Sequence, residues 1–108
     1  MKFAVYELPK ACWDNRDIFE WLFERSPRGA TAWLDAYDRM IGRLTAVADT
    51  MPRAQEANGL DLEVNEILFK SARGRFYRAV FHLDGGNVYI LRIRGPGQAP
   101  IASDDLTP

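Results

Sequence analysis

Hydrophobic and polar residues alternate in two neighbouring stretches of the C-terminal half of this chain. Between Phe76 and Leu83, the residues that fall on one side of an extended chain are Tyr77, Ala79, Phe81 and Leu83. Between Val88 and Arg94, the corresponding set is Tyr89, Leu91 and Ile93. A period of two is typical of strands with one buried face, so the pattern predicts two half-buried strands.

The four residues between these strands, Asp84-Gly85-Gly86-Asn87, predict a tight hairpin turn. Glycine reaches positive φ without a Cβ clash, which favours a Gly-Gly pair in such a turn. If the Tyr77 and Tyr89 sides share one core, the loop needs an odd length of about three residues, because a one-residue slip exchanges the two faces. This pairing places Arg78, Arg92 and Arg94 together on the other, open face.

Apolar residues spaced three and four apart predict two helices in the N-terminal half. The first begins near Lys10 and carries the stripe Ala11, Asp14, Ile18, Trp21, Leu22 and Arg25. Ser26-Pro27 then suits the start of a second helix, since Ser is a good N-cap and Pro fits the first helical position. Its stripe is the clearest in the chain, and Met51-Pro52 ends it: Ala30, Trp33, Leu34, Tyr37, Ile41, Leu44 and Ala48.

Two further apolar runs complete the expected elements. Phe3–Leu8 predicts a short first strand that ends at Pro9, and Leu62–Phe69 predicts a strand after a loop over 53–61. The order is therefore strand, helix, helix, strand, strand, strand. We expect an α+β domain over residues 1–95, with both helices on one face of a mostly antiparallel four-stranded sheet. Residues 96–108, rich in proline and glycine, predict an irregular tail that leaves the sheet.

Composition supports one folded domain, because the chain has 108 residues of which 47% are hydrophobic. No apolar run approaches the roughly 18 residues of a membrane span, and no signal-peptide pattern opens the chain, so we expect a cytoplasmic protein with no membrane partner. Cys12 is the single cysteine and His82 the single histidine, so we expect no disulfide, metal or other cofactor. We interpret Cys12 as a small buried group, and Trp13, Trp21 and Trp33 as packing residues, with one of the first two exposed.

The charge is nearly balanced overall, at −1, but uneven along the chain. Six of the fourteen basic residues lie between Lys70 and Arg94, where Asp84 is the only acid. The net charge of −1 argues against a general polyanion binder, and the uneven placement of the cations predicts a local basic surface. The candidate binding residues are Lys70, Arg73, Arg75, Arg78, His82, Arg92 and Arg94.

Each candidate also has a structural interpretation. Arg78 could be a sheet-face arginine paired with Glu66. Arg92 and Arg94 could be edge charges that discourage aggregation, and charge is common in a Gly-containing loop such as the one that holds Arg73 and Arg75. His82 has the pKa range for acid–base chemistry, but a lone strand histidine is more often a surface or packing residue.

The element order and several short motifs resemble the RelE/ParE superfamily, the toxins of bacterial type II toxin–antitoxin pairs. The matching stretches cover nearly the whole chain: the Ser26-Pro27-Arg28-Gly29-Ala30 start of the second helix with Trp33, Ile41 and Leu44 behind it, Asn65-Glu66-Ile67-Leu68, Phe76-Tyr77-Arg78 with Val80-Phe81, and the strand from Val88 to Arg94. The resemblance implies a small cytoplasmic toxin that inhibits growth, serves functions such as plasmid stabilisation, and is neutralised by an antitoxin in a hetero-oligomer.

Two mechanisms occur in this superfamily. In ribosome-dependent RNases, basic residues on the open sheet face hold mRNA, and the arginine of the Tyr-Arg pair, here Arg78, stabilises charge at the scissile phosphate without a metal. An arginine fork suits that task because it is always charged and matches phosphate geometry. In ParE-like members the toxin instead binds and inhibits DNA gyrase.

The sequence departs from the RNase pattern at two places. Glu66 and Leu68 stand where RNase members commonly have lysines, and the tail from Gly95 to Pro108 has no tyrosine or histidine to serve as a general acid or base. Without such a group, the rate of RNA cleavage is roughly 10²–10⁴-fold lower. We therefore favour a ParE-like target binder over an RNase that uses Arg78. A degenerate, non-toxic binding module of the same fold is a further alternative, and a homo-oligomer stays open.

Overall fold

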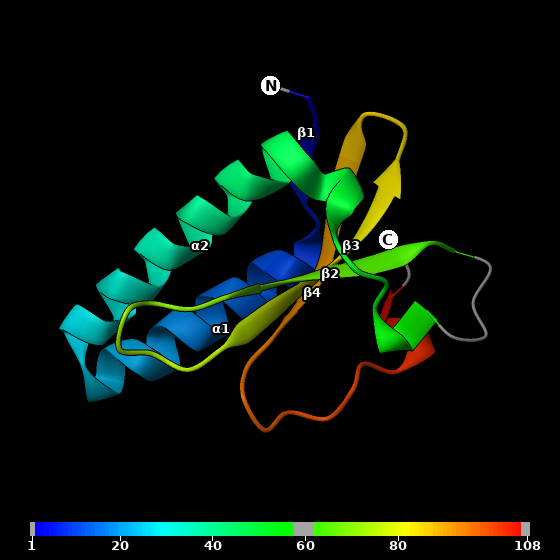
Figure 1. Ribbon diagram of the computed structural model, residues 1–108. Coiled ribbons are helices and arrows are strands. Elements are labelled where there is room, and N and C mark those ends of the chain that lie inside the picture. The colour runs from blue at the N-terminus through cyan, green and yellow to red at the C-terminus, as the bar shows by residue number, and fades with distance from the viewer. Residues whose placement is uncertain (1, 58–61, 107–108) are drawn as a thin grey trace.

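The computed structural model describes residues 2–57 and 62–106, and it confirms the α+β architecture (Figure 1). Residues 58–61 of the expected 53–61 loop lie outside the described residues. The helices are α1 (Pro9–Arg25) and α2 (Pro27–Val47), followed by short 3-10 turns, η1 (Ala48–Thr50) and η2 (Gln55–Ala57). The strands are β1 (Ala4–Glu7), β2 (Val64–Phe69), β3 (Tyr77–Asp84) and β4 (Asn87–Arg94), and a last 3-10 turn, η3 (Ser103–Leu106), lies in the tail. None of the helices described is long and apolar enough to cross a lipid bilayer.

The four strands form one sheet in the order β1-β4-β3-β2. β2 with β3 and β3 with β4 are antiparallel, while β1 runs parallel to β4. Ser26 caps α2 as expected, because its Oγ accepts the Gly29 N–H at 3.0 Å. Both helices pack on one face of the sheet (Figure 1).

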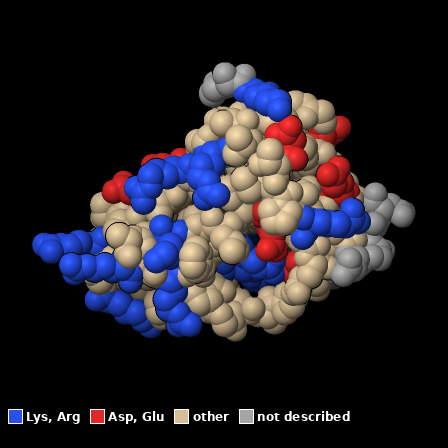
Figure 2. Space-filling view, viewed as in Figure 1, with Lys and Arg blue, Asp and Glu red and all other residues tan. Residues whose placement is uncertain are grey.

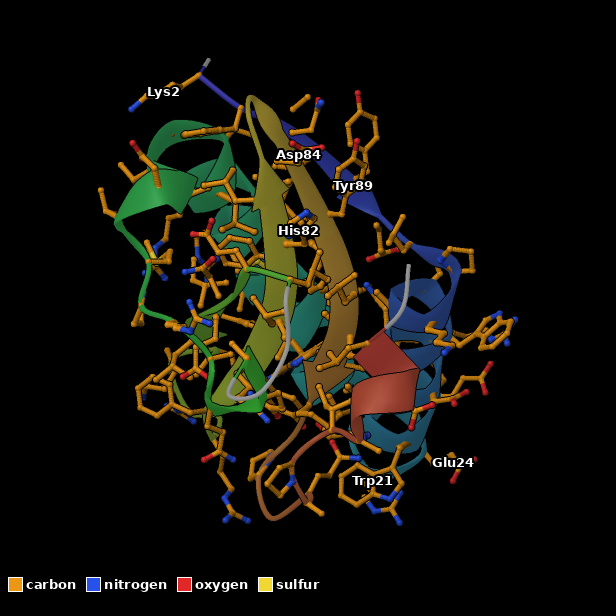
Figure 3. The ribbon with its side chains drawn as sticks, turned by 90° about the vertical axis from the view of Figure 1, so that its right-hand side faces the viewer. Lys2, Trp21, Glu24, His82, Asp84 and Tyr89 are labelled. Carbon is orange, nitrogen blue, oxygen red and sulfur yellow. The ribbon has the colours of Figure 1, made fainter. Side chains whose placement is uncertain are left out.

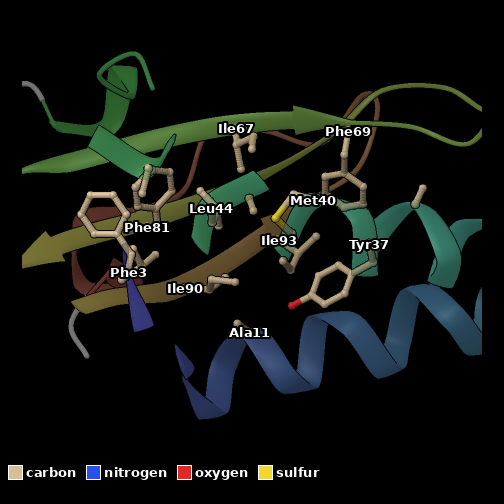
Figure 4. Close-up of a cluster of buried hydrophobic side chains, with 14 of the residues drawn as sticks. Phe3, Ala11, Tyr37, Met40, Leu44, Ile67, Phe69, Phe81, Ile90 and Ile93 are labelled. Atoms are coloured by element: carbon tan, nitrogen blue, oxygen red, sulfur yellow. The ribbon is translucent and has the colours of Figure 1, made fainter. Parts of the chain in front are cut away.

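The core between the helices and the sheet contains the aromatic and aliphatic residues of α2, β2, β3 and β4 (Figure 4). Trp33, Tyr37, Met40 and Leu44 of α2 are at most 5% exposed. Burying each large apolar side chain contributes roughly 1.5–3 kcal/mol, which holds α2 against the sheet. α1 contributes less, since Ala11 is its single fully buried residue, and both Trp13 and Trp21 are more than half exposed. The sequence predicted that one of these two tryptophans would be exposed and the other packed, whereas the structure exposes both.

The hairpin between β3 and β4 differs from the expected three-residue loop. Asp84 pairs with Asn87, so the turn has two residues, and Gly85 adopts φ +58° at its first position. Leu83 therefore pairs with Val88, and the helix-side core receives Val88 and Ile90 in place of Tyr89 and Leu91.

A β-bulge corrects the register farther along the hairpin. Val80 pairs with Arg92 and Phe81 with Ile90, so Leu91 is the extra residue of β4. Beyond the bulge, Ile93 lies in the helix-side core, as expected. The bulge also restores the expected pairing of the basic residues, since Arg94 lies opposite Arg78.

Part of the second face of the sheet is covered by the chain itself. A second buried cluster, the tail-side core, joins η2, the sheet and the C-terminal tail: Ala54, Ala57, Val64, Val80, Leu91, Ile101 and Leu106. The tail leaves β4 as expected and then returns, so that Ile101 and Leu106 are 5% and 1% exposed. The tail therefore closes part of a face that the sequence predicted could stay open, and Tyr6, His82 and Tyr89 toward the hairpin remain at least partly exposed.

Candidate functional site

Arg78 lies near the start of β3 on the tail-side face, and carboxylates surround its guanidinium. Glu56 of η2 binds it at both oxygens, with an Nη1–Oε1 distance of 2.9 Å and a second contact between Nη2 and Oε2. Glu66 of β2 accepts from Nη1 at 3.2 Å. The Arg78 side chain is 18% exposed and the Glu56 side chain 2%. Arg78 is thus held in an ion-pair network and is not a free cation.

Glu56 connects three parts of the chain. Its Oε2 also accepts the backbone N–H of Ile101 at 3.0 Å, so one carboxylate joins η2, β3 and the tail. Burial raises the pKa of this carboxyl, but the hydrogen bonds from Arg78 and Ile101 outweigh burial and lower the pKa to about 2. The same pairing, chiefly the hydrogen bond to Glu56, raises the pKa of Arg78. Glu56 and Arg78 therefore stay ionised at neutral pH.

A hollow of about 490 Å³ opens beside this network. Its lining includes the exposed side chains of Arg53 and Gln55, together with Glu66 and Arg78. The hollow gives solvent and polar ligands access to the edge of the Arg78 fork. A phosphate that reached it would meet the Glu66 carboxylate as well, which opposes binding of an anion.

Arg92 is likewise neutralised within the fold. Its Nε and Nη2 donate to the two carboxylate oxygens of Asp14 at 2.7 and 2.8 Å, and Asp14 also accepts the Ile93 N–H at 2.9 Å. Asp105 of the tail lies 3.8 Å from Arg92 Nη1. The hydrogen bond to Asp14 raises the pKa of Arg92. This arginine fixes α1 to the end of β4 where β1 no longer covers that strand.

Arg94 lies directly opposite Arg78 in the β3–β4 pairing. Like charges in this position repel each other, and the carboxylates on Arg78 offset the repulsion. The Nε of Arg94 is buried without a hydrogen-bond partner among the described residues. Arg94 is therefore beside the Arg78 network but outside its hydrogen bonds.

His82 lies away from Arg78, four residues farther along β3, or about 13 Å at the rise of a strand. Its Nδ1 is 2.7 Å from the Glu63 carbonyl oxygen. Its ring stacks on Tyr89 at 6.4 Å, and Tyr89 stacks on Tyr6 at 5.5 Å, forming a row across β3, β4 and β1. Figure 3 shows His82 and Tyr89 side by side toward the hairpin end of the sheet. His82 cannot exchange a proton with a group bound at Arg78.

Lys70, Arg73 and Arg75 lie in the loop between β2 and β3, and all three are exposed. Trp33 near the start of α2 contacts Phe69 and Tyr77 at either end of this loop, with ring centroids 5.9 and 5.6 Å apart. The loop is therefore beside the α1–α2 junction, which carries Arg25 and Arg28. In Figure 2, Lys and Arg side chains gather at the left-hand end of the molecule, where Figure 1 places these two segments. We call Arg25, Arg28, Lys70, Arg73 and Arg75 the basic end.

Exposed aromatic rings accompany these cations. Arg25 lies over the Trp21 ring at 3.6 Å, and Lys70 Nζ is 5.5 Å from the Phe76 ring centroid. Trp21 and Phe76 are 54% and 56% exposed. Large exposed aromatics next to cations are typical of contact surfaces.

Cys12 also departs from its sequence interpretation, because it is exposed. Its thiol donates to Glu7 Oε1 at 2.9 Å, and this hydrogen bond, with burial and the Glu7 charge, raises the thiol pKa to about 11. Glu7 also accepts from the Tyr37 hydroxyl. A thiol with so high a pKa is a poor nucleophile at neutral pH.

Sequence reasoning thus identified the cations of the tail-side face but missed most of their partners. Glu66 was recognised as a partner of Arg78, whereas Glu56 and Asp105 carried no local signal. Asp14 did carry one, since a carboxylate on the apolar stripe of a helix requires a partner. Comparison of the chain with models of known protein families and with curated proteins gave no match.

Proposed function

We propose that this protein is a growth-inhibiting toxin of the RelE/ParE type, neutralised in the cytoplasm by a cognate antitoxin, and that it acts by binding its target. DNA gyrase is the target that the favoured, ParE-like interpretation implies. The observation that carries this proposal is the occupation of Arg78 by Glu56 and Glu66. An RNase needs that fork free for the developing phosphate charge, and two carboxylates leave no net positive charge there.

The basic end supplies the target contact in this proposal. Its cations are exposed, whereas Arg78 and Arg92 are held by carboxylates. Exposed charges next to Trp21 and Phe76 combine steering with apolar contact area. An acidic, amphipathic antitoxin segment would match the same surface and so silence the toxin.

One observation favours the RNase alternative. Arg78 lines an open hollow, so a phosphate has a route to its guanidinium. The acid–base groups of the RNase pattern are missing from the described part of this site, since His82 is four residues farther along β3 and residues 95–108 include no tyrosine or histidine. The carboxylates beside Arg78, Glu56 and Glu66, are engaged in its ion pairs.

Induced expression in a bacterial host tests the proposal. The wild type is compared with a basic-end variant, Arg73→Glu/Arg75→Glu, and with a control of equal charge change at exposed helix positions, Arg16→Glu/Arg39→Glu. Growth, mRNA integrity and plasmid supercoiling are recorded. We expect growth arrest with altered supercoiling and intact mRNA, relieved by the basic-end variant alone. Rapid mRNA cleavage would establish the RNase alternative, and unimpaired growth would leave a non-toxic binding module.

A further inference from the structure

The tail-side core is built on three neighbouring strands. Val64 of β2, Val80 of β3 and Leu91 of β4 are each at most 2% exposed, and Ile101 and Leu106 of the tail complete their cluster. Leu91 faces this side because of the β-bulge. An apolar surface therefore lies under the tail.

The tail is held to this surface by side chains. The backbone hydrogen bonds within the described part of the tail are local, from Gln98 to Gly95 and from Asp105 to Ala102. The Ile101 N–H donates to the Glu56 carboxylate, and no described tail residue joins a strand ladder. The tail can therefore detach without breaking the pairing of β2, β3 and β4.

The cations beside the apolar surface keep partners when the tail leaves. Arg92 remains bound to Asp14, and Arg78 remains bound to Glu56 and Glu66. Asp105 sits 3.8 Å from both Arg92 and Lys10. These two contacts place η3 beside α1 and β4, as Figure 3 shows. Detachment would leave an apolar strip with Lys10 and Arg92, the two cations that Asp105 approaches, at its edge.

We propose that this strip is a docking surface for a segment of a partner protein that carries two apolar residues, five positions apart, with an acidic residue before the second. The tail has this pattern in Ile101, Asp105 and Leu106 and occupies the surface in cis. A partner segment binds by displacing it. The inference goes beyond the proposed function and is independent of it, because the surface would bind such a segment in a toxin or in a non-toxic module.

The tail acts as a competitor whose strength is set by its tether. A tethered segment has an effective concentration in the millimolar range, so a free peptide binds the wild type weakly. The observed dissociation constant rises as the fraction of molecules with a detached tail falls. Weakening the tail's own anchor should therefore tighten binding of a free peptide.

Hydrogen exchange on the full-length wild type tests the separate opening of the tail. The Ile101 amide should exchange at least about 100-fold faster than the Phe81 amide in the centre of β3, because local opening precedes global unfolding. Equal exchange rates would show that the tail opens only with the whole domain, and would overturn the proposal.

Peptide binding to the full chain tests the docking surface itself. The probe is a fluorescent peptide of residues 96–106, titrated into the wild type, into Leu106→Ser, and into Ala102→Ser as a control at an exposed tail position. We expect Leu106→Ser to bind the peptide at least about tenfold more tightly than the other two. A peptide with Ser at both apolar positions should not bind.

Three outcomes would contradict the proposal. The peptide could fail to bind Leu106→Ser, or this variant could lose its native circular dichroism, which would make the tail an inseparable part of the core. Light scattering could also reveal a dimer of the full chain that dissociates when the tail peptide is added. That result would assign the surface to the tail of a second copy.

Discussion

Glu56 and Arg78 form a two-point ion pair in which the carboxylate also accepts the backbone N–H of Ile101. The pair thus connects η2, β3 and the C-terminal tail through one buried carboxylate. The residue that the resemblance marks as catalytic is, in this chain, the centre of a structural network. This relationship underlies the preference for target binding over RNA cleavage.

Removing one partner of this pair should destabilise the domain strongly. Arg78→Met leaves the Glu56 carboxylate buried without its counter-ion, which typically costs about 3–5 kcal/mol. The paired variant Glu56→Gln/Arg78→Met should lose less stability than the sum of the two single variants, because each single variant leaves one charge without its partner and the paired variant removes both charges. Urea denaturation of the wild type, Glu56→Gln, Arg78→Met and the paired variant measures this coupling. Additive losses would show that the two side chains do not interact.

Stability should fall in acid through Glu56. Its pKa in the folded protein is about 2, below its ordinary value of 4.5, so its contribution is complete above pH 4.5 and is lost as the pH falls toward 2. The contribution is about 3 kcal/mol at most. We expect the free energy of unfolding to fall more steeply between pH 4.5 and 2 in the wild type than in Glu56→Gln. If the free energy of unfolding depended on pH in the same way in both proteins, the acid-dependent loss of stability could not be assigned to Glu56.

Asp14 should matter far more than its neighbours on α1. Asp14→Asn replaces two charged hydrogen bonds to Arg92 and weakens the one from Ile93, so a loss of about 2–3 kcal/mol is expected. Asp17→Asn, at an exposed position of the same helix, should stay within about 0.5 kcal/mol of the wild type. Thermal denaturation of both variants provides the comparison, and equal effects would argue against the Asp14 bridge.

The Cys12 thiol should react slowly for an exposed cysteine. Its hydrogen bond to Glu7 holds its pKa near 11, so little thiolate is present at pH 8. Glu7→Gln removes the charge and should accelerate alkylation by iodoacetamide roughly tenfold or more. Rates measured between pH 7 and 10 should show the shift directly, whereas unchanged rates would mean that Glu7 does not control the thiol.

Local patterns were sufficient to predict the helices, the strands and their layer arrangement. The α2 stripe and the Ser26 cap are local signals, and the structure confirms both. The hairpin register was harder, because the Gly85 turn and the bulge at Leu91 each shift the chain by one residue and their effects cancel at Ile93. Strand alternation alone cannot reveal two compensating shifts.

The surroundings of the candidate site depend on contacts between distant segments. Glu56 is 22 positions from Arg78 and 45 from Ile101, in a loop with no periodic pattern. The folding back of the tail is equally invisible, since its proline and glycine content indicates an irregular chain but not its position. The sequence thus indicated the pairing of Arg78 with Glu66, which the structure confirms, but not the further partners Glu56, Asp14 and Asp105.

The most direct test of the central claim uses the paired variant Glu56→Gln/Arg78→Met, expressed beside the wild type at equal levels. Circular dichroism of the purified variant first verifies its fold, and growth, mRNA integrity and supercoiling are then followed after induction. We predict that the variant still arrests growth, with intact mRNA and the same change in supercoiling as the wild type. Cleavage of mRNA by the wild type that the folded variant has lost would contradict the account, because it would make Arg78 a catalytic residue.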